Sequence, residues 1–500
     1  MDFQIKFETY LARHGLKSEA MFQAIKDDIV SGRLEADCRL PSSRSLAEQY
    51  GLSRGTVNLV YDRLNSQGYT YAREGSGTYV MHGMYKLAAH TSDRTSHAGV
   101  MELDGKEGEV ELSTWGNRLR QQPLLRSHRG RPCPGGQVPI EFLLGRVDLG
   151  YFPAKEWNRL MYEQVRESYN SQLSNAFETE GYGPLREGIA QHLRRTRGVM
   201  ADTDDVVIVN GSQQAITLLV QLSVNPGDLV AVENPHYLGN RRAILAAGGQ
   251  LELYPVDREG MVFEDTLTDA RLLLTTTGRQ FPTGAILSME RRLRLLRWAD
   301  QAGALIIEDD YDSEHRYKGR PLEPLKALDQ ADRVAFIGTF SRTMMQDNRL
   351  AYVVLPRSWR THFLKAKQLL EPHPSSILEQ RALAEFMSRG LYERHLRRMR
   401  RVYKRRHELL QSLLQTHVGE LFDIQDTDGG LHLYARWKHP SISMDRYMAL
   451  CEENGVRFVD CRSYHAGDPV PSACFGFAHL DEQSLIQGAQ RLRAAADGLD

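Results

Sequence analysis

ADRVAFIGTFSRT, residues 331–343, is a run of apolar residues that ends in a turn of small and hydroxylated residues with one cation, Arg342. The stretch before it, ALIIEDDYDSEHRY (304–317), has the same form, but its apolar run ends in acidic residues. Apolar runs of this length, separated by helical segments, are typical of a mostly parallel sheet with helices on both faces. Because such sheets bind ligands beyond the carboxyl ends of their strands, both turns indicate a ligand site.

Three earlier segments repeat the order of strand, turn and helix. They are DVVIVNGSQQAITLLVQL (205–222), LVAVENPHYLGNRRAI (229–244) and ARLLLTTTGRQFPTGAILS (270–288). In the first, the backbone N–H groups of Gly211–Gln213 and the dipole of the following helix would form an anion site, although most Gly-Ser turns merely connect elements. From about residue 140 onward, the pattern predicts an α/β fold whose strand-end turns gather on one edge.

The composition is that of an ordinary globular protein, with 41% hydrophobic and 25% charged residues among 500. The net charge of −1 gives no global basic signature, so any contact with nucleic acid must come from a local patch. Five scattered cysteines without a CxxC pair favour reduced thiols over disulfides or a metal site. The amino-terminal stretch lacks a signal-peptide pattern, and no apolar run reaches the roughly 18 residues of a membrane span. We therefore expect a cytoplasmic protein without membrane association.

The first 80 residues follow the order helix, helix, helix and hairpin. Apolar residues at helical spacing lie in SEAMFQAIKDDIVSG (18–32), and LPSSRSLAEQYG (40–51) and SRGTVNLVYDRLNSQGY (53–69) predict two helices around a tight turn. TYAREGSGTYV (70–80) alternates around a glycine-rich tip. The start of the second helix in such a pair contacts base edges and phosphates, and glycines at the tip allow close approach to a phosphate. The pattern predicts a winged helix-turn-helix that binds double-stranded DNA.

Residues 17–81 closely resemble the winged helix of GntR-type bacterial repressors through LPSSRSLAEQYGLSRGTVNLVYDRLNSQGY and GSGTYV. We place this domain at 14–81, followed by a polar, flexible linker at 82–111. Together, the pattern and the resemblance put these residues in contact with DNA: Arg44, Ser53, Arg54, Thr56, Asn58, Gly75, Ser76 and Gly77. Asn58 stands where some members carry a basic residue, so no base preference follows.

Residues 140–490 resemble the fold-type I aminotransferases that use pyridoxal phosphate. The resemblance is carried, in order, by GYGPLREGI (181–189), NGSQQA, ENPHY, RQFPTG, EDDYDSE and GTFSRT. Joined to the GntR-like domain, the whole chain resembles a MocR-type transcriptional regulator. This resemblance implies an aminotransferase-like domain at 112–500 that dimerises and senses a ligand, with a small α+β subdomain at about 365–500.

The resemblance also implies a seat for the cofactor. Asp309 would pair with the pyridinium nitrogen of pyridoxal phosphate, Tyr311 would bond to the ring hydroxyl, and Tyr237 would stack on the ring. The residues implied around the phosphate are Gly211, Ser212, Gln213, Thr339, Ser341 and Arg349.

Arg342 is the main departure from the family. It stands 33 residues after Asp309, where the aminotransferases carry the lysine that forms a Schiff base with the cofactor aldehyde. A Schiff base requires a neutral amine, and an arginine effectively cannot lose its proton because its pKa is above about 12. We therefore expect no catalytic residue and no enzyme activity, and we expect that any pyridoxal phosphate binds only non-covalently.

Two further departures affect the same pocket. Arg279 replaces a common histidine and would add a second fixed cation beside Arg342, and Cys474 stands where aminotransferases place the arginine that grips the substrate carboxylate. Two cations suit a small anionic effector. Alternatively, Asp309 forms a salt bridge with Arg342 and the pocket is filled by its own side chains. The residues leave both alternatives open.

These observations predict a sequence-specific DNA-binding transcriptional regulator that binds an operator as a homodimer, with two winged helices on two half-sites. The alternative is a pyridoxal-phosphate-dependent aminotransferase with an accessory DNA-binding arm, and Arg342 discriminates between the two. Lys318 and Lys326 lie in the loop before Arg342, but no pattern places either lysine at the ring.

Overall fold

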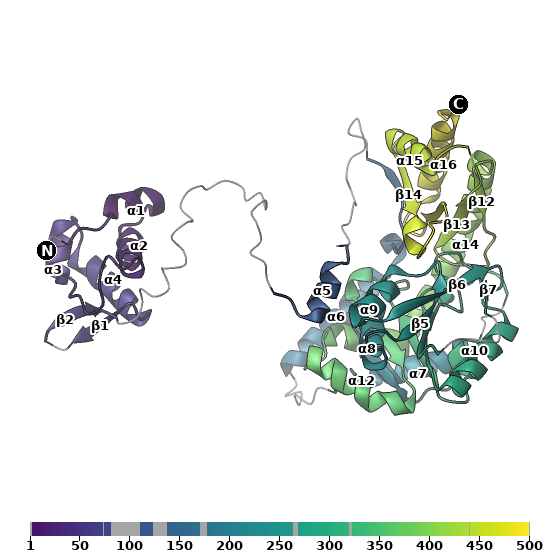
Figure 1. Ribbon diagram of the computed structural model, residues 1–500, viewed down its shortest axis with the longest axis horizontal. Helices are drawn as coiled ribbons and strands as arrows, with labels where there is room; N and C mark the ends of the chain where they lie inside the picture. Colours follow the sequence, from purple (N-terminus) through teal and green to yellow (C-terminus); the bar gives the residue numbers. More distant parts are fainter. Residues whose placement is uncertain are drawn as a thin grey trace. The chain divides into compact units, whose positions relative to one another are not determined.

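In the computed structural model, the chain forms two compact units, Met1–Val110 and Glu111–Asp500 (Figure 1). The structure describes residues 3–73, 75–81, 111–123, 138–170, 178–263, 269–319, 323–439 and 441–499. The expected linker lies outside these ranges, apart from Glu111. Among the helices in these ranges, we find none with both the length and the apolar character that a membrane crossing requires.

The amino-terminal unit is built from helices and one hairpin. Its elements are α1 (Phe7–His14), α2 (Lys17–Val30), α3 (Ser43–Gln49), α4 (Arg54–Ser66), β1 (Thr70–Arg73) and β2 (Gly77–Val80), and the two strands pair antiparallel. Residues expected to face inward are buried, including Ile25 in α2, Leu46 in α3 and Leu64 in α4. Helix α1 precedes the domain expected from the sequence and adds Phe7 to the same core. The predicted winged helix-turn-helix fold is confirmed.

An eight-stranded sheet forms the centre of the second unit. Its strands are β4 (Val206–Val209), β5 (Leu229–Asn234), β6 (Gln250–Asp257), β7 (Gly260–Met261), β8 (Leu272–Thr275), β9 (Leu305–Asp310), β10 (Val334–Thr339) and β11 (Ala351–Val354), in the spatial order β4-β11-β10-β9-β8-β5-β6-β7. All neighbours from β10 to β6 run parallel, which confirms the mostly parallel sheet. Strand β11 lies antiparallel between β4 and β10, so β4 has the direction of the central strands.

Helices cover both faces of this sheet (Figure 1). One face carries α6 (Ala154–Asn170), α7 (Gly183–Arg197), α10 (Met289–Ala302) and α13 (Ile377–Ser388), and the other carries α8 (Ser212–Ser223), α9 (Leu238–Ala247) and α12 (Arg357–Leu370). Because side chains alternate along a strand, Val206 and Ile208 join the first core while Val207 and Val209 join the second. Burial on both faces is the reason for the uninterrupted apolar runs in the sequence.

The carboxyl-terminal subdomain is an α+β layer around a second sheet. Its five strands have the order β12 (Phe422–Ile424), β13 (His432–Trp437), β15 (Ser472–Gly476), β14 (Val456–Asp460) and β3 (Ile140–Phe142), and its helices are α14 (Leu391–Val418), α15 (Met444–Glu453) and α16 (Glu482–Asp497). Strand β3 pairs parallel with β14, so this sheet also recruits a segment from far earlier in the chain. The short elements are α5 (Thr114–Arg120), α11 (Leu325–Leu328), η2 (Leu149–Tyr151), η3 (Thr203–Asp205), η4 (Ser313–His315), η5 (Gln346–Asn348) and η6 (Arg462–Tyr464).

Candidate functional site

A cavity of about 310 Å³ lies at the edge of the large sheet where the strand-end turns meet. The carboxyl ends of β4, β5, β8, β9 and β10 lie at this edge, and the amino end of β11 joins them because that strand runs the opposite way. The cavity wall contains every residue expected for the cofactor seat, namely Gly211, Ser212, Gln213, Tyr237, Asp309, Tyr311, Thr339, Ser341 and Arg349, and it also contains Arg342. The lining residues that the sequence did not single out are Leu144, Gly145, Thr276, Phe281 and Tyr464.

Two buried polar atoms in the cavity wall have no hydrogen-bond partner among the described residues. They are Oδ1 of Asp309, near the end of β9, and the hydroxyl of Tyr311 just beyond it. Burial, together with the neighbouring Asp310, raises the pKa of Asp309 to about 7 against the opposing effect of Arg342. Burial also raises the pKa of Tyr311, so its hydroxyl keeps its proton. A buried polar group without a partner costs free energy, and a ligand that supplies the partner recovers it.

Two arginines in the wall each lie against a glycine. A Cβ atom at Gly145 would stand 2.3 Å from Nη1 of Arg342, and one at Gly211 would stand 2.5 Å from Nη2 of Arg349. Both glycines have a positive φ, 80° and 84°, which other residues rarely adopt. Within the described ranges, neither guanidinium forms a hydrogen bond or an ion pair. Both cations therefore line the cavity with their hydrogen-bond donors available.

Helix α8 begins at this edge, directly after Gly211. The N–H of Asn210 donates to Oε1 of Gln214 at 2.8 Å, and the side chain of Gln213 donates to the carbonyl of Gly239 at 3.1 Å, which holds the turn in place. The first N–H groups of a helix have no intrahelical partner, and the helix dipole is positive there. Together with the guanidinium of Arg349, which lies against Gly211, this turn forms a corner suited to an anion such as phosphate.

Aromatic rings form another wall of the cavity. Phe281 contacts the rings of Tyr237, Tyr311 and Tyr464 edge-on, with centroid distances of 5.9, 5.8 and 4.9 Å. Phe281 belongs to the RQFPTG motif, so the sequence contained a signal for it, whereas Tyr464 comes from the carboxyl-terminal subdomain and no motif marks it. This wall suits a ligand with a flat ring.

The structure corrects one expectation about charge in the cavity and decides against one of the two alternatives. Arg279 does not line it, because its Nη2 donates to the carbonyl of His432 at 3.2 Å and its Nε lies 3.6 Å from Oδ2 of Asp312. No ion pair joins Asp309 to Arg342 in the described part of the chain, since the guanidinium packs on a glycine instead. The pocket is therefore not filled by its own side chains.

No lysine lies among the described residues that line the cavity. Nζ of Lys326 is 3.4 Å from Asp332, and Nζ of Lys318 is 3.7 Å from Asp426. Cys474 is buried in β15 in the same small cluster as Cys461. Residue 342 in the cavity wall is thus an arginine, and Cys474 does not line the cavity.

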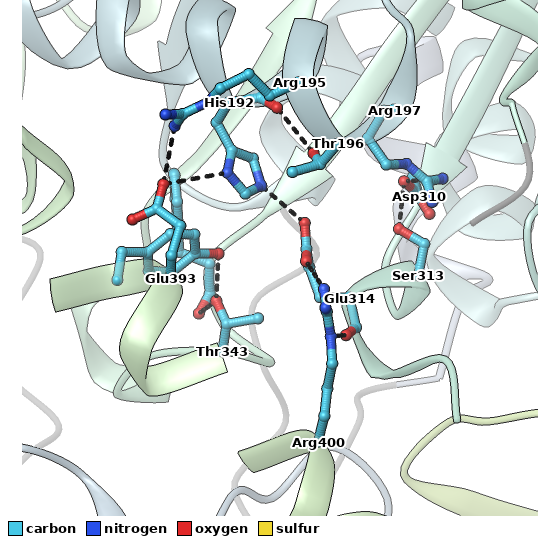
Figure 2. Close-up of polar contacts among 12 residues, drawn as sticks. His192, Arg195, Thr196, Arg197, Asp310, Ser313, Glu314, Thr343, Glu393 and Arg400 are labelled. Atoms are coloured by element: carbon cyan, nitrogen blue, oxygen red, sulfur yellow. Dashed lines mark hydrogen bonds and ion pairs between the residues drawn. The ribbon is translucent and has the colours of Figure 1, made fainter. Parts of the chain in front are cut away.

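A charged network joins α7, the turn after β9 and α14 (Figure 2). Glu314 lies 2.9 Å from Nε2 of His192 on α7 and accepts from Nη2 of Arg400 on α14 at 2.9 Å. Glu393 lies 3.8 Å from the other ring nitrogen of His192 and accepts from Arg195 at 3.0 Å. Burial lowers the pKa of His192, but the two carboxylates outweigh burial and raise it to about 9. The imidazolium of His192 therefore links α7 to the first turns of α14.

The same network fixes the two turns that carry the cavity residues. Nη2 of Arg197 donates to Oδ2 of Asp310 at 2.8 Å, and the Ser313 hydroxyl donates to the same oxygen at 2.6 Å (Figure 2). Nε2 of His315 lies 3.0 Å from the backbone carbonyl of Arg342. The turn after β9 and the turn after β10 are thus held to each other, which limits how the polar groups on them can move.

The residues expected to contact DNA lie on the helix-turn-helix and on the wing. Arg44, Arg54 and Asn58 are exposed, and the exposed Ser53 caps α4 by accepting a hydrogen bond from the N–H of Thr56 at 3.1 Å. At the wing tip, Gly75 and Gly77 have positive φ values of 72° and 118°, and the Ser76 hydroxyl lies 2.7 Å from that of Tyr79. The cap and the glycines give the backbone the geometry that close approach to DNA requires.

Two further residues on this surface were not predicted. Leu59 on α4 is 64% exposed, out of phase with the buried face formed by Val57 and Val60. An exposed apolar residue on a recognition helix suits the methyl group of thymine. Arg73 stacks over the ring of Tyr79 at 4.9 Å, which places a cation on the wing. The sequence contained a signal for Leu59, because its position in the helical repeat falls outside the buried face that contains Val57 and Val60.

Known protein families match both units. The model of the bacterial regulatory proteins of the gntR family matches residues 17–80, and the model of aminotransferase class I and II matches residues 151–492. The chain is 34% identical to the probable rhizopine catabolism regulatory protein MocR of Rhizobium meliloti, over 95% of this chain and 92% of that relative. The chain belongs to the MocR type of transcriptional regulator. It therefore joins a DNA-binding domain to an aminotransferase-like domain.

Other MocR-type relatives have the same organisation. The HTH-type pyridoxine biosynthesis transcriptional regulator PdxR of Corynebacterium glutamicum is 30% identical over 93% of this chain and 92% of its own length. The kynurenine aminotransferase of Pyrococcus horikoshii resembles the second unit with a TM-score of 0.67 and 26% identity, covering 73% of this chain and 93% of the enzyme. The MocR-type relatives are named as regulators, whereas this structural neighbour of the second unit is an enzyme.

The aminotransferase-like fold normally binds pyridoxal phosphate, and the cavity residues of this MocR-type chain fit that group. The unpartnered Oδ1 of Asp309 suits a ring N–H, and the unpartnered hydroxyl of Tyr311 suits a ring oxygen. The corner formed by Arg349 and the start of α8 suits a phosphate. Arg342 adds hydrogen-bond donors to the cavity wall, and its guanidinium is not a nucleophilic amine.

Proposed function

We propose that this regulator senses a small anionic ligand in the strand-end cavity without a covalent bond to it, and that the cavity performs no transamination. The observation that carries this proposal is Arg342, which lines the cavity with an unpaired guanidinium. From the motif GTFSRT we infer that it stands at the family's lysine position. The nearby lysines are engaged with carboxylates elsewhere. A guanidinium keeps its proton at any physiological pH, so it cannot act as the nucleophilic amine.

The other wall residues would bind and orient the ligand. Pyridoxal phosphate, where it is bound, supplies an electron sink for reactions of amino compounds. Asp309 and Tyr311 would fix the position of its ring by hydrogen bonds, and Arg349 with the first turn of α8 would hold its phosphate. Arg342 would donate hydrogen bonds to the remaining polar substituent. Every one of these roles is binding, and none transfers a group.

Ligand sensing also requires a link between the cavity and DNA. A ligand changes the affinity for DNA only if it binds two arrangements of the protein unequally. We propose a homodimer, from the family resemblance, in which two winged helices occupy two half-sites and the ligand shifts the geometry that the dimer presents. Sedimentation of the full chain tests the dimer. A monomer at micromolar concentration in the presence of DNA would contradict it.

The test of the DNA-binding role is fluorescence anisotropy with DNA from around the protein's own gene. We expect sequence-specific binding that weakens steeply with salt, because phosphate contacts release counterions. A scrambled duplex of the same composition is the control. Equal affinity for both duplexes would contradict the proposal.

The test of the chemistry is a comparison of the wild-type chain with Arg342→Lys. Both are incubated with pyridoxal phosphate, reduced with borohydride and analysed by mass spectrometry. We expect a reducible adduct on residue 342 in the lysine variant alone, because the rest of the cavity fits the cofactor. An adduct on any lysine of the wild-type chain would contradict the non-covalent role.

The second candidate function is an aminotransferase with a DNA-binding arm. It is favoured by the intact cavity and by Asp309 and Tyr311, whose unpartnered atoms fit the cofactor ring. Amino-group transfer from a panel of amino acids to 2-oxo acids, measured with and without added pyridoxal phosphate, separates the two functions. Turnover that disappears in Arg342→Gln would establish the enzyme and refute the sensing role as stated.

A further inference from the structure

We propose that the ligand of this cavity carries two separate anionic groups, a phosphate monoester bound at Arg349 and a carboxylate bound at Arg342. This inference rests on the proposed function and specifies the class of ligand that the same site takes. It makes Arg342 a specificity residue for the ligand, rather than the remnant of a lost catalytic lysine.

The balance of charge in the cavity wall is the first support. The ionisable lining residues other than tyrosines are Arg342, Arg349 and Asp309, within the ranges that the structure describes. Burial raises the pKa of Asp309 to about 7, so this carboxylate is only partly charged near neutral pH and balances neither arginine fully. Arg342 is half-buried and Arg349 is exposed, and neither guanidinium has an ion-pair partner among the described residues. A ligand with more than one negative group can therefore form a charge-assisted contact with each cation.

The second support is that the two guanidinium groups lie against different segments of the cavity wall. Arg349 lies against Gly211 at the start of α8, whereas Arg342 lies against Gly145, which follows β3. A phosphate at the α8 corner is already met by backbone N–H groups and by one guanidinium. The guanidinium of Arg342 lies against a different segment, so it is available to a second group of the ligand.

The shape of the guanidinium selects the second group. Its planar fork presents parallel N–H donors that match the two oxygens of a carboxylate. The Cβ-free surface of Gly145 accommodates this fork at a distance that no side chain at residue 145 would allow. The aromatic wall around Phe281 and the unpartnered atoms of Asp309 and Tyr311 then suit a polar ring between the two anionic groups.

Isothermal titration calorimetry of the full-length protein tests this with three related probes. Pyridoxine 5′-phosphate and 4-pyridoxic acid 5′-phosphate differ only in a hydroxymethyl or a carboxylate group on one ring carbon, and neither has an aldehyde that could form a covalent bond. The third probe, 4-pyridoxic acid, keeps the carboxylate and lacks the phosphate. We expect the probe with both anions to bind at least about tenfold more tightly than either other probe, the factor that one charge-assisted contact provides.

Variants assign the preference to one side chain. In Arg342→Gln, the affinity for 4-pyridoxic acid 5′-phosphate divided by that for pyridoxine 5′-phosphate is expected to fall to about one. In Arg342→Lys, this ratio is expected to stay above one because the positive charge remains. Arg349→Gln is the matched control, since it should weaken both phosphates and keep the preference for the carboxylate. Thermal unfolding of each variant shows whether the second unit is still folded.

The outcomes separate this inference from the proposed function. The two-anion ligand is refuted if both phosphorylated probes bind the wild-type chain equally, or if Arg342→Gln keeps the preference for the probe with the carboxylate. Non-covalent sensing stands in either case. If no probe binds to the folded wild-type chain, both the two-anion ligand and binding of a phosphorylated pyridine fail together. The inference is supported if the wild-type chain prefers the probe with the carboxylate about tenfold, if variants of residue 342 reduce this preference, and if Arg349→Gln keeps it.

Discussion

His192 is expected to make the stability of the second unit depend on pH in a specific window. The imidazole is buried between Glu314 and Glu393, which are themselves held by Arg400 and Arg195 (Figure 2). Replacement by glutamine in His192→Gln keeps a polar side chain but removes the positive charge. The two carboxylates then lose the cation that lies between them, and α7 loses its charged link to α14.

The magnitude follows from the pKa of His192. Its pKa is raised from 6.5 to about 9 in the folded chain, which corresponds to roughly 3 kcal/mol of stabilisation. This contribution is fully present below pH 6.5 and is lost as the pH rises through about 9. The pKa of Glu314, lowered to about 2, reflects the same attraction and changes stability only as the pH falls below 4.5, outside this window.

Differential scanning calorimetry of both chains between pH 6 and pH 10 measures the effect. For a unit of about 390 residues, roughly 3 kcal/mol corresponds to a change of about 4 °C in Tm. The wild-type advantage over His192→Gln should be largest at pH 6 and should shrink by this amount at pH 10. His407→Gln is the control, because burial lowers the pKa of His407 to about 4 and it stays neutral throughout. A constant difference between wild type and His192→Gln at every pH would refute the reasoning.

Three further outcomes test other parts of the molecule. Gly145→Ala should displace the Arg342 guanidinium and weaken calorimetric binding of 4-pyridoxic acid 5′-phosphate at least about tenfold, whereas Gly467→Ala, at a similar φ of 83° in open space, should leave binding unchanged. Ser53→Ala should destabilise the amino-terminal unit by about 1 kcal/mol in thermal unfolding, because α4 loses its cap. Arg54→Gln should weaken binding to all duplexes in anisotropy titrations and reduce the salt slope by about 1, and an unchanged slope would argue against a phosphate contact.

The candidate cavity was well predicted from local sequence because its parts sit at strand ends. Each apolar run fixes where a strand stops, and parallel strands bring their carboxyl ends to one edge. Asp309, Ser212 and Thr339 could therefore be placed together without knowing any distance. The arginine at residue 342 in the motif GTFSRT was equally visible, because a residue type and its position in a motif are properties of the sequence.

The charge distribution inside the cavity was not predictable in the same way. Arg279 and Arg342 both follow strand-end motifs, yet only Arg342 lines the cavity, while Arg279 turns to Asp312 and His432. A long side chain chooses among partners several ångströms apart, and the choice depends on which carbonyls and carboxylates other segments bring near it. Local sequence contains no information about those segments.

The sequence by itself determined the two folds, the edge that holds the site, and the arginine at residue 342, which cannot act as a reactive amine. These properties depend on residue type and on short-range periodicity. Only the tertiary structure decided that the pocket stays open, that Gly145 seats the guanidinium, and that Asp309 and Tyr311 lack partners. Those facts depend on packing between segments hundreds of residues apart, because burial and partner choice are set by the whole fold.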